Sequence, residues 1–487
     1  MALASEKCLM STDVRLFTDA QLEEIHLASL EILDRTGVRV YDYEAVRLLQ
    51  DAGCLIADKD LVKIPAAVIE RALQHVPNQV VLYNRNGETC VYLEGNRTYF
   101  GTGSDLPYIL DLETGERRPS LLLDVRQTSR LVDALPNLDF VMSMALPTDV
   151  PAKISDRLSF LSMVENTTKP IVFTAWDEIG LADIIAMSEV IAGGSESLST
   201  RPFLLAYLEP VSPLQHSKEA VKKILMMADH GLPFVYAPGA MSGITAPMTP
   251  AGSLALVNAE VLSGMLIAQL RREGTPIIWG AGCGPMDMRT MIAPYASPEG
   301  ILHCIAMAEL ARHYYRVPVW GYAGCCDSKV LDAQAGIEAS LGIFCAALSG
   351  ANLVHDVGYM ESGLTGSYEL IVLCDEIISL VRRMLQGIGL GVDQFALDII
   401  NQVGPGGNFL HSPHTREHHR KSWSPRILDW QSYQAWRRAG HPSVDKTARD
   451  VAREILATHT PLPLDAEILR ELTTIVELAE AGIRNSP

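Results

Sequence analysis

The sequence lacks the common motifs that would reveal a chemistry directly. It has no C-x-x-C pair, no HExxH motif, no phosphate-binding P-loop and no GxGxxG fingerprint, and its nine cysteines are an odd number spread over 487 residues. These absences argue against a zinc protease, a P-loop nucleotide enzyme, a dinucleotide-binding domain and a disulfide-stabilised fold. We therefore expect no metal site on this chain.

Positive charge is also scarce. Lys and Arg number 40 against 58 Asp and Glu, a formal net charge of −18, which repels nucleic acids and anionic membranes. The longest apolar stretch, residues 252–270, is interrupted by Asn258 and Glu260, and the N-terminus lacks the apolar core of a signal peptide. With 48% hydrophobic residues, the chain is expected to be a folded cytoplasmic protein that binds neither nucleic acid nor membrane.

The first 136 residues mix helical and strand patterns. A helical pattern opens at Thr18 and closes at Gly37, and a second covers residues 62–76. Asn86 and Gly87 separate two β-rich runs, as in a hairpin, and a strand, a Gly-rich loop and a strand follow. The sequence predicts an N-terminal cap of mixed α and β structure.

From residue 137, short apolar runs alternate with helical segments, which is the pattern of a parallel sheet. The runs are DFVMSMA (139–145), PIVFTAW (170–176), FLLAYLEP (203–210), PFVYAPG (233–239), PIIWGAG (276–282), PVWGYAG (318–324) and NLVHDVGY (352–359), with GGNFLH (406–411) as a candidate eighth strand. The sequence therefore predicts an α/β fold, a TIM (β/α)8 barrel over 137–411 between a cap (1–136) and a helical C-terminal extension (412–487).

Aromatic residues make up only 6% of the chain, yet they gather where the predicted strands end. Barrel enzymes carry their chemistry at these ends, and a ring of π-faces holds a quaternary ammonium, which donates no hydrogen bonds. The candidate substrate-binding residues are Tyr99, Tyr207, Tyr236, Trp279, Trp320, Tyr322 and Tyr359, with the acids Asp105, Glu209, Asp356 and Glu361. The competing interpretation is that the aromatics pack within the strands and that the acids are surface groups or helix caps.

His355 is the candidate catalytic residue, because it follows a buried apolar strand and precedes Asp356. A polar pair in that place either lines a cavity or is a hydrogen-bonded part of the core. The glycines of the loop at 403–411 bring backbone N–H groups close to a ligand, or simply turn the chain. The His-rich tract 411–419 is typical of a surface patch, and Cys325 and Cys326 are expected to pack.

Several segments in one order resemble the trimethylamine methyltransferase family. They are FGTGSDLPYILDLETGERRPSLLLDV (100–125), LPNLDFV, TKPIVF, AGCCDSKVLDAQAGIEAS (323–340), LVHDVGYMESG (353–363) and VGPGGNFLHSPHT (403–415). The resemblance runs from about residue 18 to 440. It implies a TIM barrel that transfers a methyl group from an amine to the Co(I) of a corrinoid (cobalamin) carried by a separate protein, with no cofactor tightly bound on this chain.

Founding members of the family carry pyrrolysine, whereas this chain has only standard amino acids. It therefore resembles the branch that demethylates quaternary amines such as glycine betaine. Their leaving group is a neutral tertiary amine, so a cage that orients one methyl group is sufficient and no acid catalyst is needed. The resemblance further implies that His355 lies beside the cobalt or the substrate and that Gly404, Gly406 and Gly407 bind the cofactor.

Two other functions stay open at this point. One is a betaine-binding or regulatory barrel without methyl transfer. The other is a lyase that forms a Lys Schiff base. Lysines at strand ends are scarce, which argues against it: Lys329 lies in the loop or helix start after the sixth predicted strand, and Lys169 precedes the second. As for many large barrel proteins, we expect a homo-oligomer.

Overall fold

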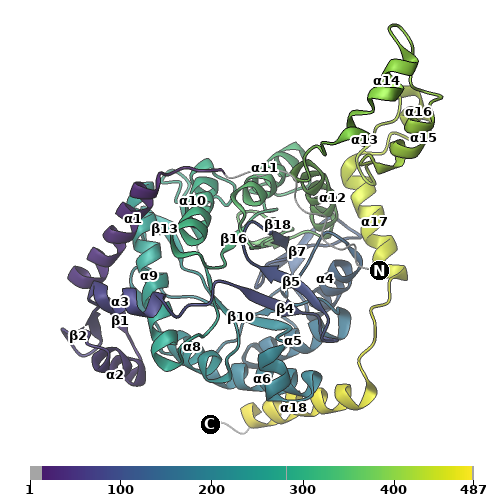
Figure 1. The fold of residues 1–487 in the computed structure, drawn as a ribbon. Coiled ribbons are helices and arrows are strands. Elements are labelled where there is room, and N and C mark those ends of the chain that lie inside the picture. The colour runs from purple at the N-terminus through teal and green to yellow at the C-terminus, as the bar shows by residue number, and fades with distance from the viewer. Residues whose placement is uncertain (1–13, 281, 485–487) are drawn as a thin grey trace.

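A computed structural model describes residues 14–280 and 282–484. At its centre, eight parallel segments form a closed ring (Figure 1). In order around the ring they are β6 (Tyr99–Phe100), the bridged residues Phe140 and Val141, β9 (Ile171–Phe173), β10 (Leu204–Leu208), β12 (Phe234–Tyr236), β14 (Ile277–Trp279), β16 (Trp320–Tyr322) and β17 (Leu353–His355). The ring closes because β17 pairs with both β16 and β6. The fold is an α/β barrel.

One helix follows each segment and covers the outside of the ring. These helices are α4 (Leu122–Ala134), α5 (Ser155–Asn166), α6 (Glu178–Ala192), α8 (Lys218–His230), α9 (Pro250–Arg271), α10 (Pro298–Glu309), α11 (Ala333–Ser349) and α12 (Tyr368–Leu385). The strands are short apolar runs because their side chains pack inward against the barrel interior or outward against these helices.

The predicted barrel is confirmed at seven of its eight segments, and the eighth is corrected. Residues 406–411 form no strand; they lie in turns and coil between α14 (Leu397–Val403) and α15 (Pro413–His418). The missing segment is β6, which lies in the region predicted as the cap, so the barrel does not begin at residue 137. The sequence predicts a strand here but does not reveal that it belongs to the barrel, because its two residues run into the glycines Gly101 and Gly103 and form no long apolar run.

The predicted hairpin is confirmed and closes one end of the barrel. Strands β4 (Val80–Tyr83) and β5 (Thr89–Leu93) pair with each other, and their buried residues pack against interior side chains such as Leu205 and Ile278. The hairpin lies at the end where the strands begin, since the Tyr83 N–H donates to the carbonyl of Pro202, just before β10. The opposite end of the barrel, which we call the mouth, is not covered by this hairpin.

The barrel mouth carries additional short strands. They are β7 (Tyr108–Leu110), β8 (Arg117–Pro119), β13 (Gly239–Ser242), β15 (Gly282–Pro285), β18 (Tyr359–Met360) and β19 (Thr365–Gly366). β13 pairs with β15, and β18, β19, β7 and β8 form one small sheet. Both sheets belong to loops that follow barrel strands, so they build the walls of the mouth.

N-terminal elements pack on one side of the barrel, against α9 (Figure 1). They are α1 (Asp19–Glu31), α2 (Tyr43–Asp51), α3 (Ala66–Leu73), β1 (Val38–Val40), β2 (Leu55–Ile56) and β3 (Leu61–Lys63), and β1 also pairs with β11 (Gln215–His216). The predicted first helix begins where the sequence indicates: the Thr18 side chain accepts from the Gln21 N–H, and the Gln21 side chain accepts from the Thr18 N–H.

The C-terminal part returns to the barrel as two long helices. α17 (Val444–Thr458) contacts α12 and α4, and α18 (Ala466–Arg484) lies along α6 (Figure 1). Between α12 and α17, residues 386–443 leave the barrel as a projection that we call the arm; it contains α13 (Val392–Phe395), α14, α15 and α16 (Tyr433–Arg438). Short segment α7 (Ser195–Thr200) follows α6.

Helix α9 is the one described helix with the length and apolar composition of a membrane span, and 83% of its most apolar window is buried within the protein. Its two polar interruptions are fully buried and bonded. The amide of Asn258 donates to Ser29 and Tyr315, and Glu260 accepts from Ser212 Oγ at 2.8 Å and the Leu214 N–H at 2.6 Å. The helix is thus a core element with internal polar contacts.

Burial raises the pKa of Glu260 from 4.5 to about 7, which gives a prediction. A carboxyl whose pKa is raised by folding stabilises the fold fully below its unfolded pKa, and this contribution is lost as the pH rises to about 7. We compare the unfolding free energy of Glu260→Gln with that of the native chain at pH 4.5 and at pH 8. The difference should shift in favour of Glu260→Gln by about 3 kcal/mol over this range. Urea unfolding at both pH values measures the two free energies. The exposed Glu24→Gln variant is the control. Parallel pH profiles of the native and Glu260→Gln chains would contradict the prediction.

Candidate active site

A cavity of about 220 Å3 lies at the barrel mouth, where β10, β12, β14, β16 and β17 end. Its lining includes Tyr207, Glu209, Tyr295, Trp320, Tyr322, His355 and Asp356, with glycine and alanine of β13 and β15 on one side. Asp105 and Asp356 at this mouth both have positive φ, 66° and 71°. Such backbone strain in non-glycine residues is concentrated at functional sites. We call the 220 Å3 cavity the cage.

Three rings form one wall of the cage. The rings of Trp320 and His355 stack with centroids 4.5 Å apart, and the Tyr207 ring lies 5.6 Å from Trp320 and 5.8 Å from His355. His355 Nδ1 lies 2.7 Å from an Asp356 carboxylate oxygen, which fixes the orientation of the imidazole. The wall therefore consists of mutually supported aromatic faces.

Tyr295 and Tyr322 form a second wall, with their rings edge to face at 5.7 Å. Tyr359 does not line the cavity; it packs edge to face against Tyr295 at 6.3 Å and donates its hydroxyl to the carbonyl of Ser104. Sequence reasoning missed Tyr295 because it stands 16 residues after β14, just before α10, and not at a strand end. Its position before the Ser297 helix cap is the signal that places it on the same face of the barrel.

Glu209 supplies negative charge to the cage. The Tyr207 hydroxyl donates to its carboxylate at 2.5 Å. Removal from bulk water raises the pKa of Glu209, while the Tyr207 hydrogen bond and the nearby His355 lower it in part. The carboxylate is still reached by solvent through the cavity, so a cation that enters the cage meets both π-faces and a carboxylate, the combination that binds an ammonium group without hydrogen bonds.

Besides Tyr359, three of the predicted aromatic cage residues lie elsewhere. Tyr236 and Trp279 are 0% exposed and point outward from the barrel: the Tyr236 hydroxyl is hydrogen-bonded to His216, and the Trp279 indole N–H donates to Asn258. Their strand neighbours Val235 and Ile278 point inward, as the alternation along a strand requires. Tyr99 lies at the start of β6, near the closing hairpin, where its hydroxyl accepts from the Tyr92 N–H.

Two predicted acids also lie outside the cage. Glu361 forms an ion pair with Arg117 at 2.7 Å and accepts from Thr365, in the small sheet above the mouth. Asp105 belongs to a neighbouring cavity, where it accepts from Ser104 and Thr174. Of the four acids expected from the sequence, Glu209 and Asp356 line the cage.

The predicted cofactor loop is not at the barrel mouth. Gly404, Gly406 and Gly407 lie between α14 and α15 on the arm, which is anchored to the outer face of α12 through Trp423 and Arg426. Gly404 and Gly406 adopt φ values of 66° and 80°, so they turn the chain there. The loop is therefore remote from the cage, which the sequence does not reveal, and the binding of the cofactor by these glycines stays a prediction.

The two lysines weighed for a Schiff base are also remote from the cage. Lys169 donates to the carbonyls of Val132, Leu135 and Leu138 at 2.6–2.7 Å, at the start of β9. Lys329 is exposed and donates to the carbonyl of Asp327. Neither is available as a nucleophile in the cage.

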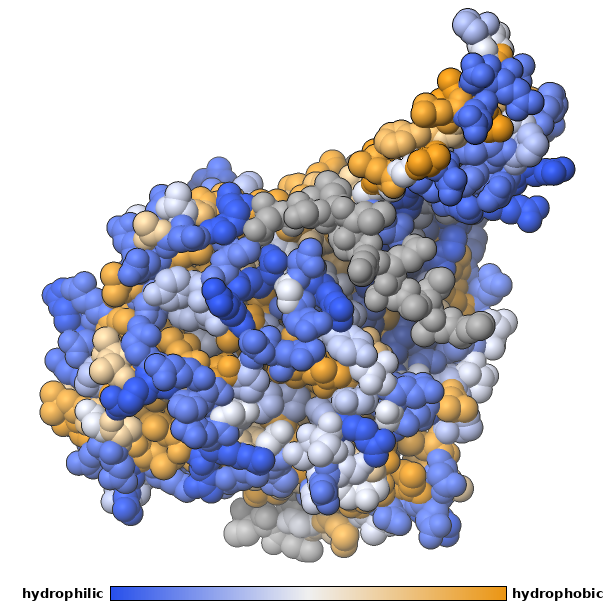
Figure 2. Space-filling view, viewed as in Figure 1, coloured by the Kyte–Doolittle hydropathy of each residue, from blue (hydrophilic) through white to orange (hydrophobic). Residues whose placement is uncertain are grey.

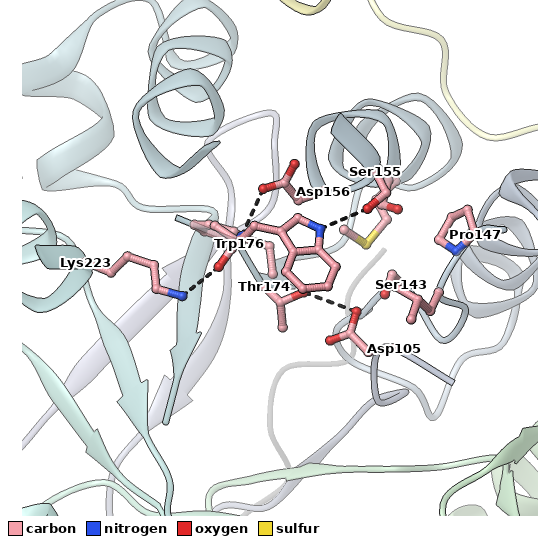
Figure 3. Close-up of a pocket in the computed structure, with 13 residues that line it drawn as sticks. Asp105, Ser143, Pro147, Ser155, Asp156, Thr174, Trp176 and Lys223 are labelled. Atoms are coloured by element: carbon pink, nitrogen blue, oxygen red, sulfur yellow. Dashed lines mark hydrogen bonds between the residues drawn. The ribbon is translucent and has the colours of Figure 1, made fainter. Parts of the chain in front are cut away.

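A second cavity, of about 370 Å3, is lined by residues that follow β9, the strand beside β10 (Figure 3). Its lining is more polar and includes Asp105, Ser143, Ser155, Asp156, Trp176 and Lys223. The Trp176 N–H and indole N–H donate to Asp156 and Ser155. Sequence reasoning missed Lys223, whose α8 pattern KEAVKKI is that of an ordinary solvent-exposed helix face.

Comparison with known proteins gives matches over nearly the whole chain. The family model described as "Trimethylamine methyltransferase (MTTB)" matches residues 6–483. A trimethylamine methyltransferase MttB of Desulfitobacterium hafniense (strain DSM 10664 / DCB-2) is 33% identical over 95% of this chain and 94% of its own length. A glycine betaine methyltransferase of D. hafniense (strain Y51) is 31% identical over 95% and 96%, and MttB of Methanosarcina barkeri (strain Fusaro / DSM 804) is 32% identical over 99% of both chains. The chain belongs to the trimethylamine methyltransferase family.

Proposed function

We propose that this protein transfers a methyl group from a quaternary amine, glycine betaine or a related betaine, to the Co(I) of a corrinoid carried by a separate protein. The observation that carries the proposal is the cage, in which Tyr207, Trp320 and Tyr322 surround a space beside the Glu209 carboxylate. The similarity to a glycine betaine methyltransferase supports the same substrate class.

The cage suits a quaternary ammonium better than an amine that must be protonated. Because the nitrogen carries a permanent charge, its methyl group is displaced with a neutral tertiary amine as leaving group, and the C–N bonding pair stays on nitrogen. The chain has to bind the cation, point one methyl group out of the mouth and exclude water. The rings and Glu209 bind the cation. The stacking of Trp320 on His355 holds the rings in the geometry that points one methyl group out of the mouth.

In this scheme, His355 is a positioning residue. It lines the cage, stacks on Trp320 and is oriented by Asp356, so it supports the ring that faces the cation. The methyl acceptor is a second substrate, delivered by its own protein, and it approaches through the same mouth. No part of the scheme uses Gly404, Gly406 or Gly407.

Incubation with a Co(I) corrinoid and a panel of methylated amines tests the function. We expect the cobalt spectrum to change to that of a methyl-Co(III) corrinoid with a betaine and not with mono-, di- or trimethylamine. Calorimetry on the same samples measures binding. Betaine binding without methylation would favour the betaine-binding or regulatory barrel, and neither signal with any quaternary amine would overturn both readings.

A homo-oligomer and a cytoplasmic location remain proposals, and the arm supports the first. Figure 2 shows apolar side chains gathered along the arm, among them Ile388, Leu390 and Val392, each more than three-quarters exposed. Residues 386–443 carry six Lys and Arg against four Asp and Glu, whereas the rest of the chain has a net charge of −20. A second copy of the chain therefore offers an acidic surface for a basic, apolar arm.

A further inference from the structure

We propose that the second cavity at the barrel mouth binds the carboxylate tail of the substrate, with Lys223 as its countercharge and Ser143 as a hydrogen-bond donor. This inference rests on the proposed function, because it assumes that the ammonium end of the substrate occupies the cage. It names the residues that hold the anionic tail of a betaine and so distinguish it from trimethylammonium compounds with a neutral tail.

Lys223 is the only lysine or arginine among the described residues that line either cavity. It extends from α8, is partly buried, and its ammonium group donates to the Ala175 carbonyl at 2.6 Å. An ammonium has three N–H donors, so two of them are left for a ligand. In Figure 3, Lys223, Asp105, Ser143 and Trp176 converge on this cavity from separate elements.

Ser143 provides an independent observation. Its side chain is 6% exposed and lines the second cavity, and its hydroxyl has no hydrogen-bond partner within the described protein. A buried hydroxyl without a partner costs roughly 1–3 kcal/mol relative to a satisfied one. Such a donor beside a cavity is explained by a ligand oxygen that accepts from it.

The two cavities are electrostatically joined through Lys223. Burial raises the pKa of Asp105, which lines the second cavity, and of Glu209, which lines the cage, and the charge of Lys223 lowers both in part. A betaine that spans both cavities places its ammonium beside Glu209 and its carboxylate beside Lys223, so each charge of the zwitterion meets an opposite charge.

The acids of the second cavity do not oppose a carboxylate tail. Asp156 is paired with Arg157 at 3.0 Å and also accepts from the Trp176 N–H. Asp105 accepts hydrogen bonds from Ser104 and Thr174, and burial raises the pKa of its carboxyl. Lys223 is therefore the group of this lining that can pair with an anionic tail.

The test compares glycine betaine with choline, whose tail ends in a neutral hydroxyl, in calorimetric binding and in methyl transfer. We expect Lys223→Met to raise the Kd and KM for glycine betaine about 10–100-fold and to leave those for choline within about twofold, because only the carboxylate loses its charge-assisted bond. Lys223→Arg should restore part of the preference, and Ser143→Ala should weaken glycine betaine binding by about 3–10-fold.

Lys222→Met is the matched control. Lys222 is the neighbouring residue on α8, but its ammonium lies 3.7 Å from Asp42 and Glu44 on the outside of the barrel. An unchanged ratio of glycine betaine to choline affinity in Lys223→Met, or an equal loss for both ligands, would overturn the proposed tail site while the cage function stands. Failure of the native protein to bind either ligand would overturn both.

Discussion

Replacement of Trp320 by leucine is expected to lower kcat/KM for betaine demethylation by about 10–100-fold. Trp320 is 1% exposed, lines the cage and stacks on His355 at 4.5 Å. An indole face that binds a desolvated cation contributes on the order of 2 kcal/mol, and its loss also frees the imidazole. Steady-state kinetics with saturating Co(I) corrinoid measure the effect, together with calorimetric affinity for the betaine.

Trp279→Leu is the matched control for this variant. Trp279 is the last residue of β14, the strand beside β16, which begins with Trp320. It is 0% exposed, and its indole N–H donates a hydrogen bond to Asn258 in the helical layer. Both substitutions remove a buried indole, so both are expected to reduce the unfolding free energy by about 3 kcal/mol. Only Trp320→Leu should change substrate affinity. Similar kinetic losses in the two variants would refute the assignment of Trp320 to the cage.

Glu209→Gln is expected to weaken betaine binding about 10–100-fold, with the loss in KM larger than the loss in kcat. The substitution keeps an acceptor for the Tyr207 hydroxyl and removes the negative charge that faces the cation. The pKa of Glu209 is raised by its removal from water. The native affinity should therefore fall as the pH drops through this raised pKa, because the carboxyl becomes neutral, whereas the affinity of Glu209→Gln should stay flat.

Glu361→Gln provides the comparison. The sequence suggests Glu361 as a cage acid as well, but its carboxylate pairs with Arg117. We expect less than a twofold change in KM and no altered pH profile. A loss as large as that of Glu209→Gln would mean that the mouth closes over the substrate in a different arrangement.

The order of the barrel elements is readable from the sequence for a physical reason. Parallel strands buried on both faces are short continuous apolar runs, and the helices between them end at glycine or proline. The runs that contain β9, β10, β12, β14, β16 and β17 follow this rule. β6 does not, because its two residues are held by neighbours far away in the chain, Leu353 and Val354.

The candidate site, like the barrel, was predicted from the sequence in part, and the tertiary structure decided the rest. The sequence alone determined the family, seven of the eight segments of the ring, and the set of strand ends from which the cage residues Tyr207, Glu209, Trp320, Tyr322, His355 and Asp356 come. Only the tertiary structure decided which aromatic side chain at a strand end turns inward, because the twist and tilt of the barrel fix that direction and local composition does not. For the same reason, Tyr295 and Lys223 reach the mouth from a loop and a helix, while Trp279 and Tyr236 turn away into the helical layer.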